Sequence, residues 1–491
     1  MITTRFAPSP TGYVHIGSLR TVLYNYLFAK KNKGKFMLRI EDTDRTRYVE
    51  GSIDNMISVL NTFGLTPDEG PNNPGDKGPY MQSERLDIYQ KYINILLEKD
   101  LAYYCFCSSE RLDELRKEQE ELKLPTKYDQ ACRYLTKEEV EEKLKAGHPY
   151  TIRLKVPKNE NVVFEDMVKG KIEINTKDVD DQVLIKSDSF PTYHFAVVVD
   201  DHLMGVTHVI RGDEWVPSTP KHILLYRAFG WDVPVYSHLP LLLGIDKKKL
   251  SKRTGDVACE VYLEKGYLIE AILNYIALLG WNPKTTEEIF SMEELIEKFD
   301  LEQIHKAGAV FDVEKLNWFN SKYIVSSNIE TLYTKLCDYL AKYDKDFYEN
   351  IFSKFDEVYN KKILKELQTR LNYFAEFKDL TKFFYTENIA CREDLFINPK
   401  MKIEDISVVK KALNLTIEIL KNNSDFSSID EMKNKFIEEI QKNEMKNGQV
   451  LWPARVALTG EEFSPGALEM IYILGNKKAS LRIEKILNLL K

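Results

Sequence analysis

Two loops that lie far apart in the sequence carry residues suited to binding phosphate. The first, residues 8–18, is rich in proline and glycine and ends in His-Ile-Gly-Ser at 15–18. A loop that follows a strand and opens a helix presents unpaired N–H groups and a partial positive charge to an anion. His15 adds a nitrogen that donates to a phosphate oxygen, and Gly17 permits close approach of backbone or ligand. By itself, so short a motif is also typical of a capped turn with a surface histidine.

The second loop, residues 247–255, holds five cations within the seven residues 247–253 and ends in a glycine. Lysine side chains act as flexible point charges on phosphate groups, so such a loop can clamp a triphosphate. A basic run by itself is usually a solvated surface. The presence of both loops in one chain favours a nucleotide site that the two loops share.

The elements expected to position the first loop are a strand, a helix and a second strand. Residues 3–7 predict the first strand, and residues 35–40 predict the second, which ends at the acidic sequence Glu-Asp-Thr-Asp of 41–44. Between them, apolar residues recur at helical spacing, at Leu19, Val22, Leu23, Tyr26 and Leu27. This order implies a parallel unit with a right-handed crossover, which binds ligands where its strands end.

The predicted secondary-structure pattern changes twice along the rest of the chain. Residues 101–186 have the character of an insertion, with charged helical segments at 109–122 and 136–145 and a strand-like run at 151–156. The α/β pattern then returns at 192–200 and 206–210, with a helix at about 218–229. Beyond about residue 260 the sequence predicts mostly helices, at 268–279, 292–299 and 363–377. In the last of these, one apolar face comprises Leu364, Leu367, Leu371 and Phe374.

The composition limits the class, the compartment and the partners. With 491 residues, 43% of them hydrophobic, the chain predicts about two to four folded domains and excludes a disordered protein. No stretch approaches about eighteen consecutive apolar residues, so we expect no membrane span. No basic leader precedes the first strand, and six cysteines in so long a chain fit a reducing cytoplasm. The net charge of −7 argues against indiscriminate binding of nucleic acid, though not against a local basic surface.

The two loops and five further segments resemble the glutamyl-tRNA synthetases, a family of class I aminoacyl-tRNA synthetases. Residues 15–18 resemble the HIGH signature of that class, and residues 249–253 (Lys-Leu-Ser-Lys-Arg) resemble its KMSKS loop. The further segments follow the family's order along nearly the whole chain, at residues 5–12, 38–44, 200–212, 273–281 and 455–460.

The resemblance implies an α/β Rossmann-type catalytic domain with an inserted acceptor-binding module, followed by all-α stem-contact and anticodon-binding domains. The catalytic domain would span residues 1–100 and 187–245, and the inserted tRNA acceptor-binding module would span 101–186. A stem-contact domain with the KMSKS-like loop would follow at 246–322. The last part, 323–491, would be a helical anticodon-binding region of two subdomains.

The resemblance also implies a glutamate–tRNA ligase that works in two steps. Glutamate attacks the α-phosphate of ATP, which carries Mg²⁺, and the resulting glutamyl-adenylate passes its acyl group to the 3′ end of tRNA(Glu). The implied catalytic residues are His15, Lys249 and Lys252, which stabilise charge on the phosphates. The implied ATP site comprises Pro8, Ser9, Thr11, Gly12, His15, Gly17, Ser18, Lys249, Leu250, Ser251, Lys252 and Arg253.

Selecting glutamate requires groups for a carboxylate side chain and for an ammonium. By resemblance, Arg5 and Arg211 would face the carboxylate, which suits the planar fork of arginine, and Glu41 would hold the ammonium. Without the resemblance, Glu41 is part of an ordinary acidic cluster and Arg211 a structural ion pair. The implied glutamate site comprises Arg5, Ala7, Ser9, Glu41, Tyr193, Arg211, Glu214 and Trp215.

Three cysteines resemble a structural zinc site found in part of this family. Cys105 and Cys107 are one residue apart, and Cys132 follows after 24 intervening residues. The usual fourth ligand is histidine, but Tyr134 stands at that position, so the alternative fourth ligand is Tyr128. The other interpretation is three buried thiols without a metal.

Four other functions share part of these features. The bacterial-type helical rear and the wording of the motifs argue against a sister enzyme that charges tRNA with glutamine. A smaller relative that glutamylates a modified tRNA base lacks the final ~170 residues. A small-metabolite adenylyltransferase needs no RNA partner, and a non-catalytic RNA-binding derivative would have lost one signature. We therefore expect tRNA(Glu), L-glutamate and ATP as partners of a cytoplasmic monomer.

Overall fold

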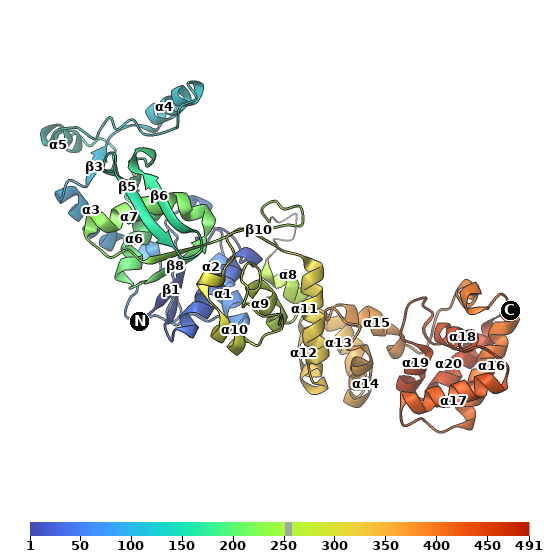
Figure 1. Ribbon diagram of the computed structural model, residues 1–491. Helices are drawn as coiled ribbons and strands as arrows, with labels where there is room; N and C mark the ends of the chain where they lie inside the picture. The colour runs from blue at the N-terminus through green and yellow to red at the C-terminus, as the bar shows by residue number, and fades with distance from the viewer. Residues whose placement is uncertain (251–257, 491) are drawn as a thin grey trace. The chain divides into compact units, whose positions relative to one another are not determined.

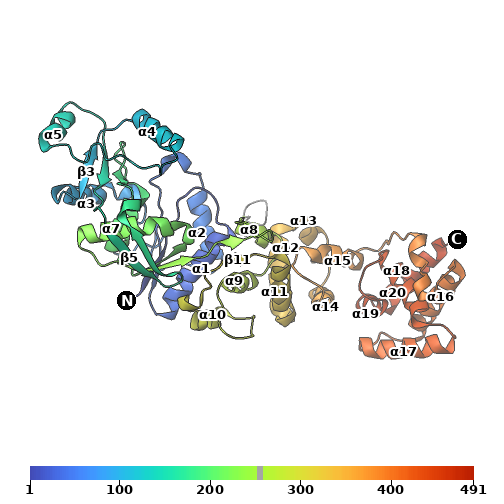
Figure 2. The ribbon, with the colours of Figure 1, turned by 45° about the horizontal axis from the view of Figure 1, so that its top comes forward.

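The computed structural model describes residues 1–250 and 258–490, and Figures 1 and 2 show it from two directions. The chain divides into two compact units. The first unit comprises Met1–Val261 and Ile269–Val313, and the second comprises Tyr262–Leu268 and Glu314–Lys491. Along the sequence, the chain thus contributes a short segment to the second unit before the first unit is complete.

The first unit begins with the predicted strand–helix–strand unit. Strand β1 (Thr3–Phe6) pairs in parallel with β2 (Lys35–Leu38), and α1 (Ile16–Lys31) connects them. The strands end one or two residues earlier than predicted, but pairing continues beyond them, because Arg39 N donates to Phe6 O and Glu41 N donates to Pro8 O. This pairing brings the first loop beside the acidic sequence that follows β2.

A second sheet has the strand order β6-β5-β9-β8, in which β5 and β6 are antiparallel and the other pairs are parallel. Its members are β5 (Asn161–Asp166), β6 (Gly170–Asn175), β8 (His208–Gly212) and β9 (Val235–Leu239). Asn25 of α1 connects this sheet to β1. Its side-chain Nδ2 donates to Ile210 O at 3.1 Å, and its backbone carbonyl accepts from Thr4 Oγ1 at 2.9 Å. The ends of β1 and β8 therefore lie near each other.

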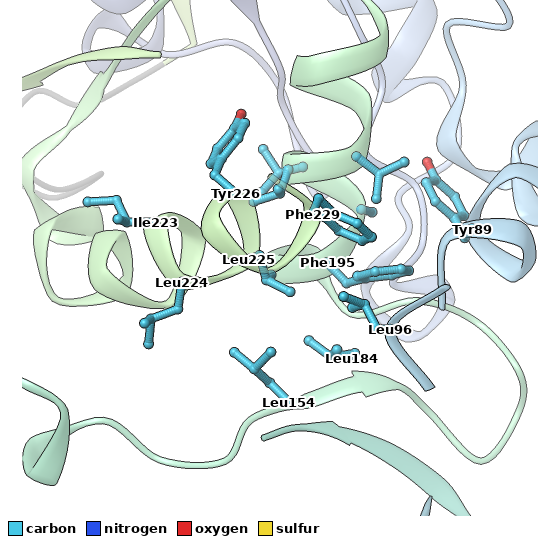
Figure 3. Close-up of a cluster of buried hydrophobic side chains, with 14 of the residues drawn as sticks. Tyr89, Leu96, Leu154, Leu184, Phe195, Ile223, Leu224, Leu225, Tyr226 and Phe229 are labelled. Carbon is cyan, nitrogen blue, oxygen red and sulfur yellow. The ribbon is translucent and has the colours of Figure 1, made fainter. Parts of the chain in front are cut away.

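Helices pack these sheets into an apolar core (Figure 3). The helices that contribute to this core are α3 (Leu86–Glu98), α6 (Tyr193–Leu203) and α7 (Thr219–Phe229). Helix α2 (Ser52–Thr62) buries Met56, Val59 and Leu60 outside this cluster. Phe195 of α6 is fully buried, with ring centroids 6.4 Å from Tyr89 and 6.5 Å from Phe229. Burial of this face of α6 fixes Tyr193 at the start of the helix and Asp200 and Asp201 near its end.

Residues 102–185 also contain a separate antiparallel sheet, β3-β4-β7. Its strands are β3 (Ala102–Cys105), β4 (Thr151–Leu154) and β7 (Val183–Ile185). The two charged helices form as predicted, as α4 (Ser109–Glu121) and α5 (Lys137–Lys145), and neither has a buried residue. The side chains of Ser108 and Thr136 cap their N-termini.

The first unit also contains the short parallel pair β10 (Leu242–Leu243) and β11 (Ala309–Val310), with α9 (Ile269–Ala277) and α10 (Met292–Lys298). Helix α8 (Cys259–Glu264) runs across the sequence boundary of the two units. Short 3-10 helices are η1 (Arg45–Arg47), η2 (Gln82–Glu84), η3 (Thr176–Asp178), η4 (Asp213–Ser218) and η5 (Leu301–Gln303).

The elements described in the second unit are helices joined by turns and loops. It contains α11 (Val313–Ser326), α12 (Ile329–Tyr343), α13 (Lys345–Asn350), α14 (Glu357–Leu367), α15 (Glu376–Tyr385), α16 (Ile406–Asn422), α17 (Ile429–Lys442), α18 (Asn447–Thr459), α19 (Ala467–Leu474) and α20 (Asn476–Leu489), with η6 (Phe352–Lys354), η7 (Glu393–Phe396) and η8 (Pro399–Met401). Among the helices described in either unit, none is both long and apolar enough to cross a bilayer.

The predicted single helix at 363–377 is wrong, because α14 ends at Leu367 and α15 begins at Glu376. Between them, Phe374 N donates to Gly266 O at 3.1 Å and Ala375 N donates to Lys265 O at 3.2 Å. These tertiary hydrogen bonds take the place of helical ones. Leu371 and Phe374 are buried as expected, but outside a helix.

Candidate active site

One cavity of 470 Å³ in the first unit gathers most of the predicted ATP and glutamate residues. The predicted residues that line it are Arg5, Ala7, Pro8, Ser9, Thr11, His15, Gly17, Ser18, Tyr193, Arg211, Glu214, Trp215, Lys249 and Leu250. Gly12 and Glu41 do not line it, and Ser251, Lys252 and Arg253 lie outside the described residues. Most of the lining comes from the ends of β1, β8 and β9 and from the start of α1. The start of α6, the segment 214–215 and the segment 249–250 supply the rest.

Sequence reasoning missed part of this lining. The missed residues are Phe6, Arg20, Thr21, Ile210, Gly212 and the segment 239–242. Arg20 and Thr21 follow Gly17 by three and four residues, so helical spacing places them on the same face of α1 as Gly17 and is a signal for finding them. The segment 239–242 has no such local signal, because only the pairing of β9 with β8 brings it to the cavity.

His15 is the N-cap of α1, and its ring folds over the first turn of the helix. Its Nδ1 accepts from the backbone N–H of Ser18 at 3.4 Å, and its Nε2 lies 3.0 Å from Ser18 Oγ. A Cβ on Gly17 would lie only 3.2 Å from the imidazole, so glycine leaves room for this ring position. The positive end of the α1 dipole therefore faces the cavity beside an imidazole, which is an arrangement suited to phosphate.

Residues on both sides of 251–257 lie against the first loop or its cavity. On one side, Leu250 N donates to Leu242 O at 2.9 Å, and Lys249 and Leu250 line the cavity. On the other side, Ala258 forms a β-bridge with His15, and Cys259 N donates to Val14 O at 3.0 Å. The described residues on either side of 251–257 are thus held at the site that contains His15.

A buried network of arginines and carboxylates lies behind the cavity. Arg5 Nε is 3.2 Å from Asp201 Oδ1, and the same carboxylate oxygen accepts from Arg39 at 2.7 Å. Arg39 also donates to Glu41 at 3.0 Å. Burial raises the pKa of Glu41 to about 7, although Arg39 and Arg5 pull it down. The Glu41 carboxylate therefore has one cationic hydrogen-bond donor, Arg39, and it lies close enough to Arg5 to feel its charge.

Asp200 extends this network toward α3. Its carboxylate accepts from Arg85 Nε at 2.7 Å, from Gln82 Nε2 at 2.9 Å and from the Tyr89 hydroxyl at 2.8 Å. Asp200 thus accepts hydrogen bonds in the core and Asp201 accepts them beneath the cavity, while Arg39 lies within 3.8 Å of Asp200 and within 2.7 Å of Asp201.

Arg211 has a different environment from Arg5. Its side chain is only 5% exposed, and among the described residues it forms no ion pair with a carboxylate. Its donors face Tyr193, Thr219 and two histidines. Tyr193 in turn packs on Trp215, with ring centroids 4.4 Å apart. A buried guanidinium without an anionic partner is suited to binding an anionic ligand, because burying an unpaired charge is costly.

The turn after β3 and the segment after α4 bring three thiols and a phenol together. The Sγ atoms of Cys105, Cys107 and Cys132 lie within 4.8 Å of one another, and the Tyr128 hydroxyl is 3.3 Å and 3.4 Å from the first two. Zn–S bonds of about 2.3 Å at tetrahedral angles separate sulfur atoms by about 3.8 Å, close to the 3.6 Å between Cys107 and Cys132. Tyr134 is 65% exposed. The donor set Cys105, Cys107, Cys132 and Tyr128 fits a tetrahedral zinc ion.

This fold and cavity are those of a class I aminoacyl-tRNA synthetase. Residues 1–318 match the family described as tRNA synthetases class I (E and Q), catalytic domain, and residues 331–487 match an anticodon binding domain. The predicted fold class, a catalytic α/β domain followed by a helical anticodon-binding domain, is confirmed.

The similarities extend along the whole chain. It is 48% identical to a glutamate–tRNA ligase of Alkaliphilus metalliredigens, over 99% of this chain and 98% of that protein. It is 46% identical to one of Clostridioides difficile, over 99% of each. The crystal structure of a glutamate tRNA ligase from Elizabethkingia meningosepticum in complex with its amino acid has a TM-score of 0.90 at 37% identity, with all of both chains covered. The chain belongs to the glutamate–tRNA ligases.

Proposed function

We propose that the protein activates L-glutamate with ATP to form glutamyl-adenylate and then transfers the glutamyl group to the 3′ end of tRNA(Glu). The observation that supports this best is the cavity itself, where the His15 loop, Lys249 and the buried cation Arg211 lie together. The first two suit a triphosphate, and the third suits an acidic amino acid.

In the first step, a carboxylate oxygen of glutamate attacks the α-phosphorus of ATP. A new P–O bond forms, and the bond between the α-phosphorus and the oxygen that bridges to the β-phosphate breaks. Pyrophosphate leaves with that oxygen and its negative charge. We assign His15, Lys249 and Lys252 to stabilising charge on the phosphates, with Mg²⁺ carried by the nucleotide. The remaining ATP contacts in this proposal come from the first loop and the basic loop, at Pro8, Ser9, Thr11, Gly12, Gly17, Ser18, Leu250, Ser251 and Arg253.

For the amino acid, we assign the side-chain carboxylate to Arg5 and Arg211 and the α-ammonium to Glu41. Glu41 has a single cationic hydrogen-bond donor and lies close enough to Arg5 and Tyr193 for its charge to influence both. Ala7, Ser9, Tyr193, Glu214 and Trp215 complete the proposed pocket. A neutral glutamine would leave the arginines underpaired, which disfavours it.

For the tRNA, we assign the acceptor end to 101–186, the stem to 246–322 and the anticodon to 323–491. The match of residues 331–487 to an anticodon binding domain supports the last assignment. We propose that the enzyme acts as a cytoplasmic monomer, which fits its six free cysteines.

We further propose a structural zinc ion held by Cys105, Cys107, Cys132 and Tyr128. When bound, the ion supplies a cross-link and no reaction step. Arg111 NH1 lies 3.5 Å from Cys107 Sγ, so a cation offsets part of the charge of the thiolates.

Pyrophosphate exchange tests the main proposal. The intact protein is assayed with glutamate or glutamine, each with and without tRNA(Glu). We expect exchange with glutamate that depends on tRNA, as the family resemblance implies, and little exchange with glutamine. Exchange that ignores both the amino acid and tRNA contradicts the proposal, and a preference for glutamine points to the sister enzyme.

A further inference from the structure

The side-chain nitrogens of Arg211 contact four side chains. Two of them carry hydroxyl groups, and the other two are histidines, which can be neutral. Arg211 Nε donates to His238 Nε2 at 3.0 Å, and one terminal nitrogen donates to Thr219 Oγ1 at 2.9 Å. The other terminal nitrogen lies 3.3 Å from both the Tyr193 hydroxyl and His222 Nδ1. Arg5 differs, because its Nε is paired with the carboxylate of Asp201.

The hydrogen-bond donors determine the protonation state of both histidines. A guanidinium has no acceptor atom, so the ring nitrogen that faces Arg211 carries a lone pair in each case. His238 then bears its proton on Nδ1, which lies 2.6 Å from Asp166 Oδ2. His222 bears its proton on Nε2, which lies 3.0 Å from His194 Nδ1. Two short series of hydrogen bonds therefore lead to Arg211, one through Asp166 and His238 and one through His194 and His222. In each, the residue that contacts Arg211 is a neutral histidine.

Burial favours these neutral forms. It is the largest cause that lowers the pKa of His222 well below its usual value, and the charge of Arg211 lowers it further. Burial also lowers the pKa of His194, to about 4, and that of His238, although Asp166 opposes the shift of His238. Both histidines that touch Arg211 thus orient it without adding or removing charge.

We propose that His238 and His222 are positioning residues that hold Arg211 through neutral imidazole acceptors, while Asp166 and His194 set their tautomers. A carboxylate in either place would orient the guanidinium equally well, but it would neutralise the charge that faces the cavity. Imidazole acceptors keep Arg211 as an uncompensated cation, so the pocket selects an acidic side chain over a neutral one. This inference rests on the proposed role of Arg211 in binding glutamate.

The first experiment replaces His238 in the full-length protein and measures tRNA-dependent pyrophosphate exchange. His238→Leu removes the acceptor for Arg211 Nε, so we expect the KM for glutamate to rise about tenfold or more, with kcat and the KM for ATP little changed. His238→Gln offers an amide oxygen near the former Nε2, so we expect most of the loss to be restored. His208→Leu is the matched control, since His208 is on the same strand as Arg211 but contacts Phe28 and Thr207, and its KM should equal the wild-type value.

The second experiment tests the tautomer. Asp166→Asn offers an amide donor to His238 Nδ1, which favours the tautomer with Nε2–H directed at Arg211, so the KM for glutamate should rise. Asp166 also accepts from the backbone N–H groups of Val168 and Lys169, and a loss of those bonds would affect folding as well. In the His238→Gln background no tautomer remains to be set, and Asp166→Asn should then have little further effect on KM.

The outcomes separate the two proposals. Wild-type exchange with glutamate, combined with an unchanged KM in His238→Leu, overturns the positioning role and leaves the proposed function standing. Equal changes in kcat and in both KM values, with a lowered melting temperature, also overturn it, because they indicate a purely structural role. Absence of glutamate-dependent exchange in the wild type overturns the proposed function and this inference together.

Discussion

Glu41, Asp42 and Asp44 follow the same strand, yet each carboxylate has different partners. Asp42 accepts from the backbone and hydroxyl of Ser83, and Asp44 accepts from Thr46 as the N-cap of a 3-10 helix. Only Glu41 turns into the buried network, where Arg39 donates to it. The sequence therefore presents an acidic cluster, and the tertiary contacts bring one member of it, Glu41, into the buried network.

The pKa of Glu41 predicts how glutamate binding depends on pH. Because burial raises this pKa to about 7, Glu41 is ionised above about pH 7 and protonated below it. A protonated Glu41 does not pair with an ammonium group, so the affinity for glutamate should increase as the pH rises toward about 7 and then level off. Below that pH, the KM for glutamate should rise about tenfold per pH unit.

The measurement is the pH profile of the KM for glutamate between about pH 5.5 and 8.5. Glu41→Gln should raise KM throughout and remove the inflection. A flat wild-type profile, or an inflection that persists in Glu41→Gln, contradicts the assignment of the ammonium to Glu41.

At the scale of elements, buried charges connect the end of β2, α6 and the start of α3. Arg39 contacts Asp201 and Glu41, and Arg85 contacts Asp200. Arg39 and Asp200 have no exposed side-chain surface, so neither has water as an alternative partner. This network holds the floor of the cavity to the core rather than adding to its apolar packing.

Arg39→Met should therefore destabilise the first unit. It leaves the buried Asp201 and Glu41 with one fewer cation, which costs about 3–5 kcal/mol. Urea denaturation followed by tryptophan fluorescence measures the loss. Arg116→Met is the control, because its ion pair with Asp113 on α4 is well exposed and should contribute less than about 1 kcal/mol. Equal stability of the two variants would contradict a structural role for the network.

The cysteine cluster holds together the turn after β3 and the segment that follows α4. We expect about one zinc ion per chain in the purified protein. Cys132→Ser should release it, and a chelator should increase proteolysis within 101–186 while sparing β1 and β2. Cys337→Ser is the control, because this cysteine lies on α12 in the second unit. Equal zinc content in the two variants would exclude Cys132 as a ligand.

At the scale of the molecule, the chain builds its second unit from two separate segments. Gly266, in the short segment, has a φ of +81°, and a Cβ there would lie 2.6 Å from the Cβ of Phe374. Backbone hydrogen bonds join the same two places. The segment 262–268 thus interrupts the sequence of the first unit because its hydrogen-bond partners in the second unit are 50 or more residues further along.

Gly266→Ala should destabilise the second unit by about 1–3 kcal/mol, because it combines a left-handed backbone with a steric clash. Hydrogen exchange of the full-length protein should show faster exchange in α14 and α15 and unchanged exchange in β1 and β2. Gly147→Ala provides the comparison, since its φ is +73° but nothing lies within 4 Å of the added carbon. A larger loss in Gly147→Ala would contradict the role of the contact with Phe374.

The sequence by itself determined the local elements and the class of chemistry. Apolar spacing predicted α1, and runs of charged residues predicted α4 and α5, because these signals depend on neighbours within a few residues. The family motifs pointed to a nucleotide and an acidic amino acid. The tertiary structure alone decided which partners those residues have. Arg5 received a carboxylate and Arg211 received imidazoles from α7 and β9, and the helix predicted at 363–377 was interrupted where the backbone N–H groups of Phe374 and Ala375 donate to the carbonyls of 265–266. Such contacts join residues distant in sequence, and no local pattern encodes them.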